Sequence, residues 1–191
     1  ATPEAVRQGK LIGGWYVSRG KTDCSMLTEY SRSVSLYVSF DARRDDSHLV
    51  LVDPSFRSVK QGDTFALDVY FGGGRQAVES YTDVSFRGIR LEDGKPGVSA
   101  LFAGSAFLRD FARAARMLIK RDDATVALLE LNGSAAAVAD LRSCAERVSR
   151  ETPSDPFDDG KSTDGAARPI GSPAAWVTND DYPPSALRAE I

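Results

Sequence analysis

The sequence predicts an α+β protein that is mainly β: an antiparallel β-sandwich or a partly closed barrel, followed by two C-terminal helices. Apolar and polar residues alternate in several runs of the first hundred residues, as in strands with one buried face. After Gly104 the apolar residues instead recur every three or four positions, as they do along the buried side of a helix. With 191 residues, 42% of them hydrophobic, the chain is long enough to bury one ordinary core.

The clearest strand runs from Val34 to Phe40, where every second residue is apolar. A second regular alternation runs from Phe65 to Phe71 and ends at three consecutive glycines, which favour a hairpin loop over a phosphate-binding turn. Further strands are expected around Trp15 and Cys24 and at residues 48–53, 78–81, 84–89 and 98–102. Short strands at this spacing, joined by turns rich in Gly, Asp and Pro, are typical of sandwiches and barrels.

Two helices are expected after these strands. The first covers residues 105–117, with Ser105 as its N-cap. A hairpin of residues 117–120 and 125–131 follows, and a second helix runs through 135–148 with Ser134 as its cap. Its expected buried face carries Val138, Leu141, Cys144 and Val148.

Composition changes near residue 150 and divides the chain into a β-rich domain (1–150), a Pro/Gly/Asp-rich linker (151–175) and a short last segment (176–191). The domain holds 21 Lys and Arg against 19 Asp and Glu, a net charge of +2, whereas residues 151–191 hold 3 against 8, a net charge of −5. Because the domain has no basic stripe, nucleic-acid binding is not expected. No apolar run approaches the roughly 18 residues of a membrane span.

The only two cysteines, Cys24 and Cys144, lie near opposite ends of the domain. The residues Ala1-Thr-Pro-Glu4 resemble a mature start after a small-residue cleavage site, the alternative being an arbitrary start. Two distant cysteines in an exported chain favour one disulfide, and two unrelated buried thiols are the alternative. Closing a loop of about 120 residues contributes roughly 4–5 kcal/mol in the chain-entropy model.

No catalytic, cofactor-binding or metal-binding residue is predicted. His48 is the only histidine, and its position beside Asp45 and Asp46 favours a surface turn. The sequence contains neither a Cys-x-x-Cys nor a His-Glu-x-x-His motif, and Ser105 lacks the Gly-x-Ser-x-Gly frame of a nucleophile elbow. A non-enzymatic protein is therefore expected, with a hydrolase that uses scattered carboxylates as a less favoured alternative.

Tyrosines provide the first candidates for binding. Tyr37 and Tyr70 are opposite in phase to the apolar residues of their strands, so they belong to the second face of the sheet. Tyrosines on such a face can form a protein-binding surface. Packing beneath the two C-terminal helices is the favoured alternative.

Residues 176–191 resemble the entry to the C-terminal domain of TonB-family energy transducers. The matching positions are Trp176, Thr178, Asp180, Asp181, Tyr182, Pro183, Ala186, Leu187 and Arg188. The resemblance implies the Gram-negative periplasm, where such domains pair strands with outer-membrane transporters and transmit energy from the inner membrane. It also makes Trp176 and Tyr182 candidate protein-binding residues. The strand-forming remainder of that domain does not follow, so this chain alone is not expected to transduce energy.

Residues 10–148 loosely resemble exported invasion-associated locus B-like β-sandwich proteins. The resemblance rests on an early Trp strand (Trp15), a Cys-bearing strand (Cys24) and a closing helix after Leu131–Ser134 that carries Leu141–Cys144. It implies a periplasmic, non-enzymatic sandwich.

Together these features predict a non-enzymatic periplasmic binding or regulatory module associated with a TonB-type protein. Its expected partner is a protein or another cell-envelope component, contacted by a sheet face or edge. The alternative is a structural envelope protein that forms homo-oligomers through its tail, with Trp176 docking on a neighbouring domain.

Overall fold

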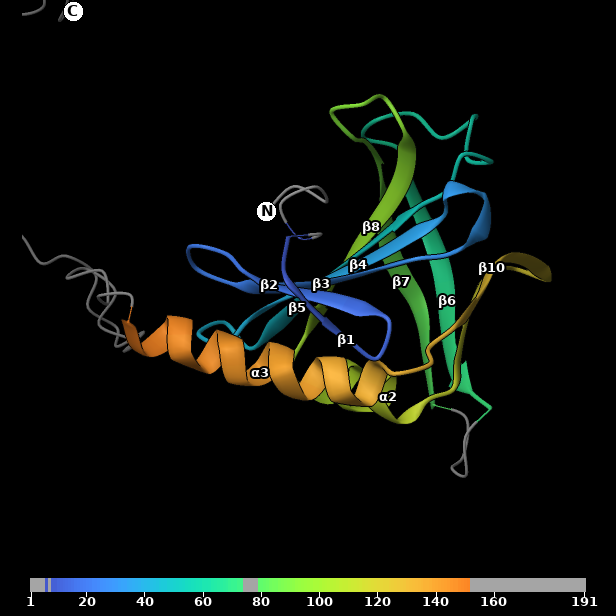
Figure 1. Cartoon of the computed structure of the whole chain (residues 1–191). Coiled ribbons are helices and arrows are strands. Elements are labelled where there is room, and N and C mark those ends of the chain that lie inside the picture. The colour runs from blue at the N-terminus through green and yellow to red at the C-terminus, as the bar shows by residue number, and fades with distance from the viewer. Residues whose placement is uncertain (1–5, 7, 74–78, 152–191) are drawn as a thin grey trace, which may run out of the picture. The chain divides into compact units, whose positions relative to one another are not determined.

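A computed structural model describes residue 6, residues 8–73 and residues 79–151. This part of the chain contains one antiparallel sheet of ten strands and two α-helices (Figure 1), which confirms the mainly β, α+β class. The strands are β1 (Lys10–Ile12), β2 (Trp15–Arg19), β3 (Cys24–Glu29), β4 (Ser35–Asp41), β5 (Asp46–Val52), β6 (Thr64–Gly72), β7 (Glu79–Arg90), β8 (Pro96–Ala103), β9 (Arg116–Arg121) and β10 (Ala124–Glu130). The predicted linker beyond Glu151 and the TonB-like segment, with Trp176 and Tyr182, lie outside the described residues.

The sheet is open and curled. Its order is β1-β2-β3-β4-β5-β8-β7-β6-β9-β10, so β1 and β10 form its two edges. The Tyr30 hydroxyl, just after β3, donates to the Glu130 carbonyl of β10 at 2.7 Å, which brings the last strand back toward the first half of the sheet. Of the two predicted architectures, a partly closed barrel describes this single sheet better than two separate layers do.

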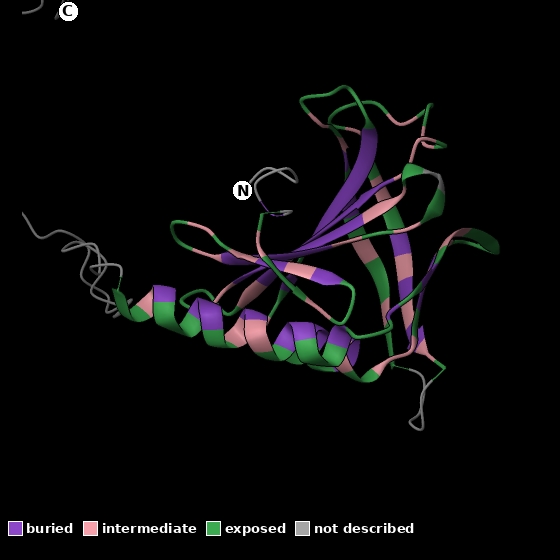
Figure 2. Ribbon diagram, in the orientation of Figure 1, coloured by how far each residue is buried: buried purple, intermediate pink, exposed green. Residues whose placement is uncertain are grey.

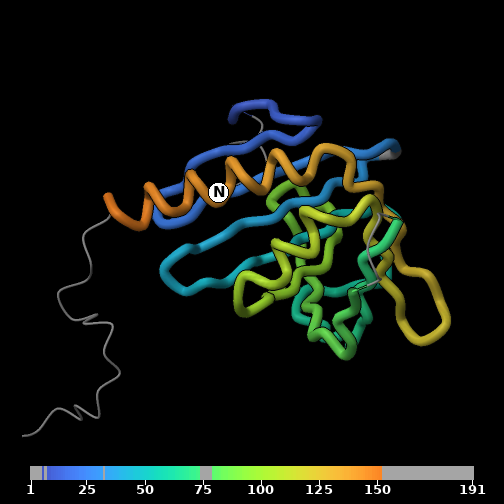
Figure 3. The backbone as a smooth tube through the Cα atoms, turned by 90° about the horizontal axis from the view of Figure 1, so that it is seen from below, coloured from blue at the N-terminus to red at the C-terminus, as the bar shows by residue number. Residues whose placement is uncertain are grey.

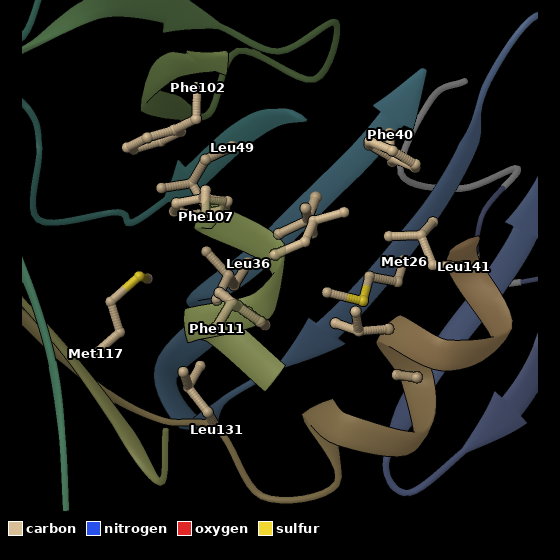
Figure 4. Close-up of a cluster of buried hydrophobic side chains, with 14 of the residues drawn as sticks. Met26, Leu36, Phe40, Leu49, Phe102, Phe107, Phe111, Met117, Leu131 and Leu141 are labelled. Carbon is tan, nitrogen blue, oxygen red and sulfur yellow. The ribbon is translucent and has the colours of Figure 1, made fainter. Parts of the chain in front are cut away.

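Both helices cover one face of the sheet. α3 (Ser134–Glu151) contacts β2, β3 and β4, and α2 (Ala106–Arg113) packs beside α3 (Figure 3). Buried residues gather between the helices and the strands (Figure 2), and Figure 4 shows how Phe107 and Phe111 of α2 meet the strand side chains. The predicted buried face of α3 is confirmed, since Val138, Leu141, Cys144 and Val148 are all buried. No helix of the described part is long and apolar enough to cross a membrane.

Cys24 and Cys144 form the predicted disulfide, with their Cα atoms 6.0 Å apart. The bond joins β3 to α3 across the core. An ion pair between Arg19 and Glu151 lies further along α3 and joins its end to β2. The helix is thereby held to the sheet both covalently and by its packing.

A close contact between two glycines fixes the start of α3. Gly13 turns the chain from β1 to β2, and a Cβ atom placed on Gly133 would lie 2.0 Å from the Gly13 carbonyl oxygen. Both glycines adopt positive φ, a conformation that other residues rarely take. Beside this contact the Trp15 indole N–H donates to the Asn132 carbonyl at 2.9 Å. The hairpin and the start of the helix are therefore packed backbone against backbone.

The first helix is shorter than predicted. The sequence favours a helix over 105–117, but α2 ends at Arg113 and Ala114 is already extended, with ψ of 145°. The Ala115 N–H then donates to the Gly72 carbonyl at 3.1 Å, and Arg116 pairs with Gly72. Pairing with β6 thus overrides the helical spacing. The predicted hairpin that follows is confirmed as β9 and β10.

Two predicted strands are one. The sequence suggests separate strands at 78–81 and 84–89, whereas the structure has the continuous β7. Asp83 interrupts the alternation because it adopts a φ of 54°, and its N–H donates to a carboxylate oxygen of Asp68 at 2.9 Å. The β6–β7 register shifts at the same place, between Leu67 and Val69. The sequence pattern is interrupted there by a β-bulge within one strand, not by the end of a strand.

Ser105 occupies the predicted N-cap position of α2, but neither predicted serine is shown capping its helix with its side chain. Ser105 makes no side-chain capping bond, and its carbonyl instead accepts from Arg142 at 3.0 Å. The Ser134 hydroxyl donates to the Phe111 carbonyl at 3.2 Å, so it ties the start of α3 to α2. Both serines therefore take part in hydrogen bonds that link α2 to α3.

Candidate functional site

A groove of about 710 Å³ runs along the free edge of β10. Residues 125–130 of β10 form one wall. The opposite side is formed by Tyr30, Ser31 and Val34 between β3 and β4, and by the segment after β5, chiefly Asp53, Pro54, Ser55 and Arg57. The groove therefore occupies the gap where the curled sheet does not close.

Two hydrogen bonds show which backbone groups of β10 face this groove. The Leu131 N–H donates to the Ala115 carbonyl at 2.8 Å, continuing the ladder toward β9. The Glu130 carbonyl instead accepts from Tyr30, on the opposite side. Because the N–H and C=O of one residue in an antiparallel strand point the same way, and alternate from residue to residue, those of Leu128 face the free edge. Leu128 therefore presents a donor and an acceptor to the groove.

The two edges of the sheet differ as templates for a further strand. β1 has three residues and begins with Lys10, and short or lysine-bearing edges resist pairing. β10 has seven residues, Ala-Thr-Val-Ala-Leu-Leu-Glu, without lysine or proline. Its register shifts between Thr125 and Ala127, and the pairing with β9 is regular from Ala127 to Glu130. The β10 edge is thus the stronger template.

We call the sheet face that the two helices do not cover the outer face. A row of apolar side chains crosses this outer face and ends at the β10 edge. Tyr70 of β6 pairs with Leu118 of β9, and Leu118 pairs with Leu128 of β10. Leu128 is 59% exposed, one of three large apolar side chains so exposed in the described part. An ion pair of 2.8 Å between Arg116 and Glu130 borders the row. An apolar centre with a charged border is typical of protein-binding surfaces.

Tyr30 remains a hydrogen-bond donor at neutral pH. Burial, and then the charge of Glu130, raise the pKa of its hydroxyl above the usual value of 10. The proton that it shares with the Glu130 carbonyl is therefore retained. This bond ties the end of β10 to the segment after β3, on the other side of the groove.

Tyr37 lies on the outer face, in phase with the sequence prediction, but it is only 9% exposed. It packs in a second apolar cluster with Leu27, Val50 and Val52, which Val6 also joins. The helices cover the opposite face, so the prediction that Tyr37 packs beneath them is wrong. Tyr70, also on the outer face, is partly exposed in the row that leads to Leu128.

His48 is not a surface turn residue. It is the third residue of β5 and is partly buried on the outer face, opposite Ser39 of β4. The turn prediction failed because β5 starts two residues earlier than the apolar run, at Asp46. Burial lowers the pKa of His48, although the carboxylates of Asp46 and Asp23 oppose this change.

Sequence reasoning missed the groove because its walls come from three separate segments of the chain. The sequence does contain one relevant feature, the apolar run Val126–Leu129 followed by a single charged residue. This run indicates an edge strand open to pairing only when β10 is known to lie at the edge of the sheet. In the described ranges no three His, Cys, Asp or Glu side chains gather as metal ligands do. No family model, curated protein or solved structure matches the chain.

Proposed function

We propose that this chain is a non-enzymatic binding module of the periplasm, associated with a TonB-type protein, that holds a partner polypeptide as an added strand on β10. The observation that carries the proposal is the free edge of β10, where the Leu128 N–H and C=O face an open groove. In strand addition, backbone hydrogen bonds supply affinity and the pockets beside the strand supply specificity.

The size and lining of the groove suit an extended peptide. Six residues of a strand span about 20 Å, which matches the six consecutive residues of β10 that line the groove. Side chains of an added strand alternate between its faces. One set would extend the apolar row that ends at Leu128, and the other would enter the groove toward Tyr30 and Val34.

The disulfide and the tail support the location. A disulfide is at home in an oxidising compartment such as the periplasm, and residues 176–191 resemble the TonB family. Mass spectrometry of unreduced protein from fractionated Gram-negative cells is expected to find the Cys24–Cys144 bond in the periplasmic fraction. Native protein with two free thiols, recovered from the cytosolic fraction, would contradict this part of the proposal.

The binding proposal is tested with a library of random twelve-residue peptides displayed on phage and selected against the full oxidised chain. The selected peptides are expected to alternate apolar and polar residues and to slow hydrogen exchange at the Leu128 amide. Leu128→Pro removes the amide that faces the groove, and an edge strand tolerates proline at such a position. We expect this variant to bind the selected peptides about tenfold more weakly, the cost of one lost backbone hydrogen bond.

Leu128→Ala is the matched control because it keeps the backbone N–H and removes only the exposed side chain. It is expected to weaken binding about threefold or less. If Leu128→Ala weakens binding as much as Leu128→Pro, the peptide docks on the outer face and strand addition is wrong. Selected peptides that protect amides elsewhere and leave Leu128 unprotected also overturn the proposal. Thermal unfolding of both variants checks that they are folded.

A further inference from the structure

A second pocket, separate from the groove, lies on the outer face of the sheet and has a volume of about 260 Å³. The strand register shows that its lining is sorted along the strands. At one end Ser39 of β4 and His48 of β5 pair with each other and line the pocket, and Ser25 of β3 continues this polar row outside the lining. The next row along the same strands consists of Leu27, Tyr37 and Val50. The pocket therefore has a polar end and an apolar end.

The apolar end continues to Val52 of β5, to Ile89 of β7 and to Leu91, with Ser35 beside Val52 as its one polar residue. Val6 packs on part of this apolar surface, against Leu27, Val50 and Val52. At the polar end the Tyr37 hydroxyl is already bonded to the Ser25 hydroxyl at 2.6 Å. Asp23, which precedes Ser25 by two residues and so lies on the same face, also lines this end. Such amphipathic pockets orient a ligand by a few polar groups and hold its body by apolar contact.

Two polar side chains at this end lack a partner. Within the described part of the chain, neither the Asp23 carboxylate nor the His48 imidazole makes a hydrogen bond or a close ion pair. Both side chains are partly exposed, so a ligand can reach their polar atoms. The polar end is therefore prepared to accept hydrogen bonds.

The charge at this end is negative. The charged groups that act on His48 are the carboxylates of Asp46 and Asp23, and Asp23 also acts on Tyr37. Burial lowers the pKa of His48, so its imidazole is mainly neutral at pH 7 and offers a nitrogen lone pair. Carboxylate and neutral imidazole together favour a ligand group that donates protons and carries positive charge.

From this arrangement we propose that the pocket binds a small amphipathic cation, a protonated amine whose ammonium group meets Asp23 and His48 while its apolar body covers Leu27, Val50 and Ile89. Its volume corresponds to about nine water molecules at roughly 30 Å³ each, so a ligand of about ten non-hydrogen atoms fits. Ligands of this size bind with a Kd of about 0.1–1 mM when well matched. This site is independent of strand addition at β10.

Three probes of similar shape test the assignment: 2-phenylethylammonium, 2-phenylethanol and 3-phenylpropionate. Each is titrated at pH 7 into the full, isotope-labelled oxidised chain, and amide shifts are followed by NMR. The ammonium probe is expected to shift amides of β3, β4 and β5 around Ser39 and His48. The alcohol and the carboxylate are expected to bind at least about tenfold more weakly because they lack the positive charge.

Asp23→Asn removes the negative charge with little change in side-chain shape. It is expected to lower the affinity for 2-phenylethylammonium at least about tenfold. Asp122→Asn is the matched control, because Asp122 lies in the β9–β10 turn at a φ of 52° that asparagine also tolerates. It should leave the affinity unchanged. Equal binding of the three probes, no saturation by about 10 mM, or an unchanged affinity in Asp23→Asn overturns the proposal.

Discussion

Replacing Cys24 and Cys144 together by serine is expected to lower the free energy of unfolding by about 4 kcal/mol. The two cysteines are 120 residues apart, so the bond closes a loop that spans most of the described domain. Without it the unfolded chain gains the entropy of that loop, which in the chain-entropy model is close to the largest effect a single disulfide has. Because domains of this size are stable by only about 5–15 kcal/mol, the loss is a large fraction of the total.

Urea denaturation of the oxidised protein and of the double variant measures this difference. Reducing agent should bring the wild type to the stability of the double variant and leave the variant itself unchanged, which makes the variant its own control. A difference below about 1 kcal/mol would contradict the entropic account.

The native fold of the double variant is nonetheless expected to keep α3 in place. The helix buries an apolar face of Ala137, Leu141 and Val148, and the Arg19–Glu151 ion pair adds an attachment near its end. Circular dichroism of the variant should therefore match that of the wild type under native conditions. The disulfide then acts on the unfolded state more than on the shape of the folded one.

The parts of the fold that the sequence predicts well are those with local causes. In the strand Val34–Phe40, the alternation of apolar and polar residues is enough to predict which side chains are buried. In α3, the recurrence of apolar residues every three or four positions predicts the buried face in the same way. The disulfide was also within reach because only two cysteines exist. In each case one short segment, or one pair, contains the whole signal.

The predictions that failed depend on partners distant in sequence. Residues 114–117 have helical spacing, yet the carbonyl of Gly72 ends the helix by pairing with the chain there. His48 was predicted to lie in a turn, but β5 begins two residues before it, at Asp46, which pairs with Asp41 of β4. Local preference is a weak term, and a sheet edge that needs a partner readily outweighs it.

The candidate site was beyond sequence reasoning for the same reason. Tyr30, Arg57 and Leu128 have no common pattern in the sequence, and they line one groove only because the sheet curls until β10 approaches the end of β3. That β10 is an edge follows from the non-sequential strand order, in which β6 lies between β7 and β9. The strand phase alone predicts the face on which Tyr70 lies, whereas its link to Leu128 through Leu118 depends on the strand register.

Replacing Phe107 by alanine is expected to lower the free energy of unfolding by about 4 kcal/mol. Phe107 is fully buried on α2 (Figure 4), and four aromatic rings contact it. It stacks on Phe102 with ring centroids 3.9 Å apart and meets Phe71 at 5.6 Å. Truncating a buried phenylalanine costs about 3–5 kcal/mol, and each lost aromatic pair adds to the transfer term.

Guanidinium denaturation measures the effect, with Phe107→Leu and Leu101→Ala as controls. Phe107→Leu keeps most of the apolar volume and is expected to cost about 1–2 kcal/mol. Leu101 is 62% exposed on β8, so its truncation should change stability by less than about 0.5 kcal/mol. A loss below about 2 kcal/mol in Phe107→Ala would mean that the neighbouring rings close the cavity.

The same substitution connects the core to the proposed binding edge. α2 ends at Arg113 and the chain enters β9 at Arg116, so the position of the β9–β10 hairpin depends on how firmly α2 is anchored. Phe107 joins α2 to β6 through Phe71 and to β8 through Phe102, while Phe111 of α2 also contacts Phe71. Below its unfolding transition, Phe107→Ala should therefore show faster hydrogen exchange in β10 and weaker binding of strand-forming peptides, whereas Leu101→Ala should show neither. If exchange in β10 is unchanged, the Tyr30–Glu130 bond and the pairing with β6 hold the edge without help from the helix.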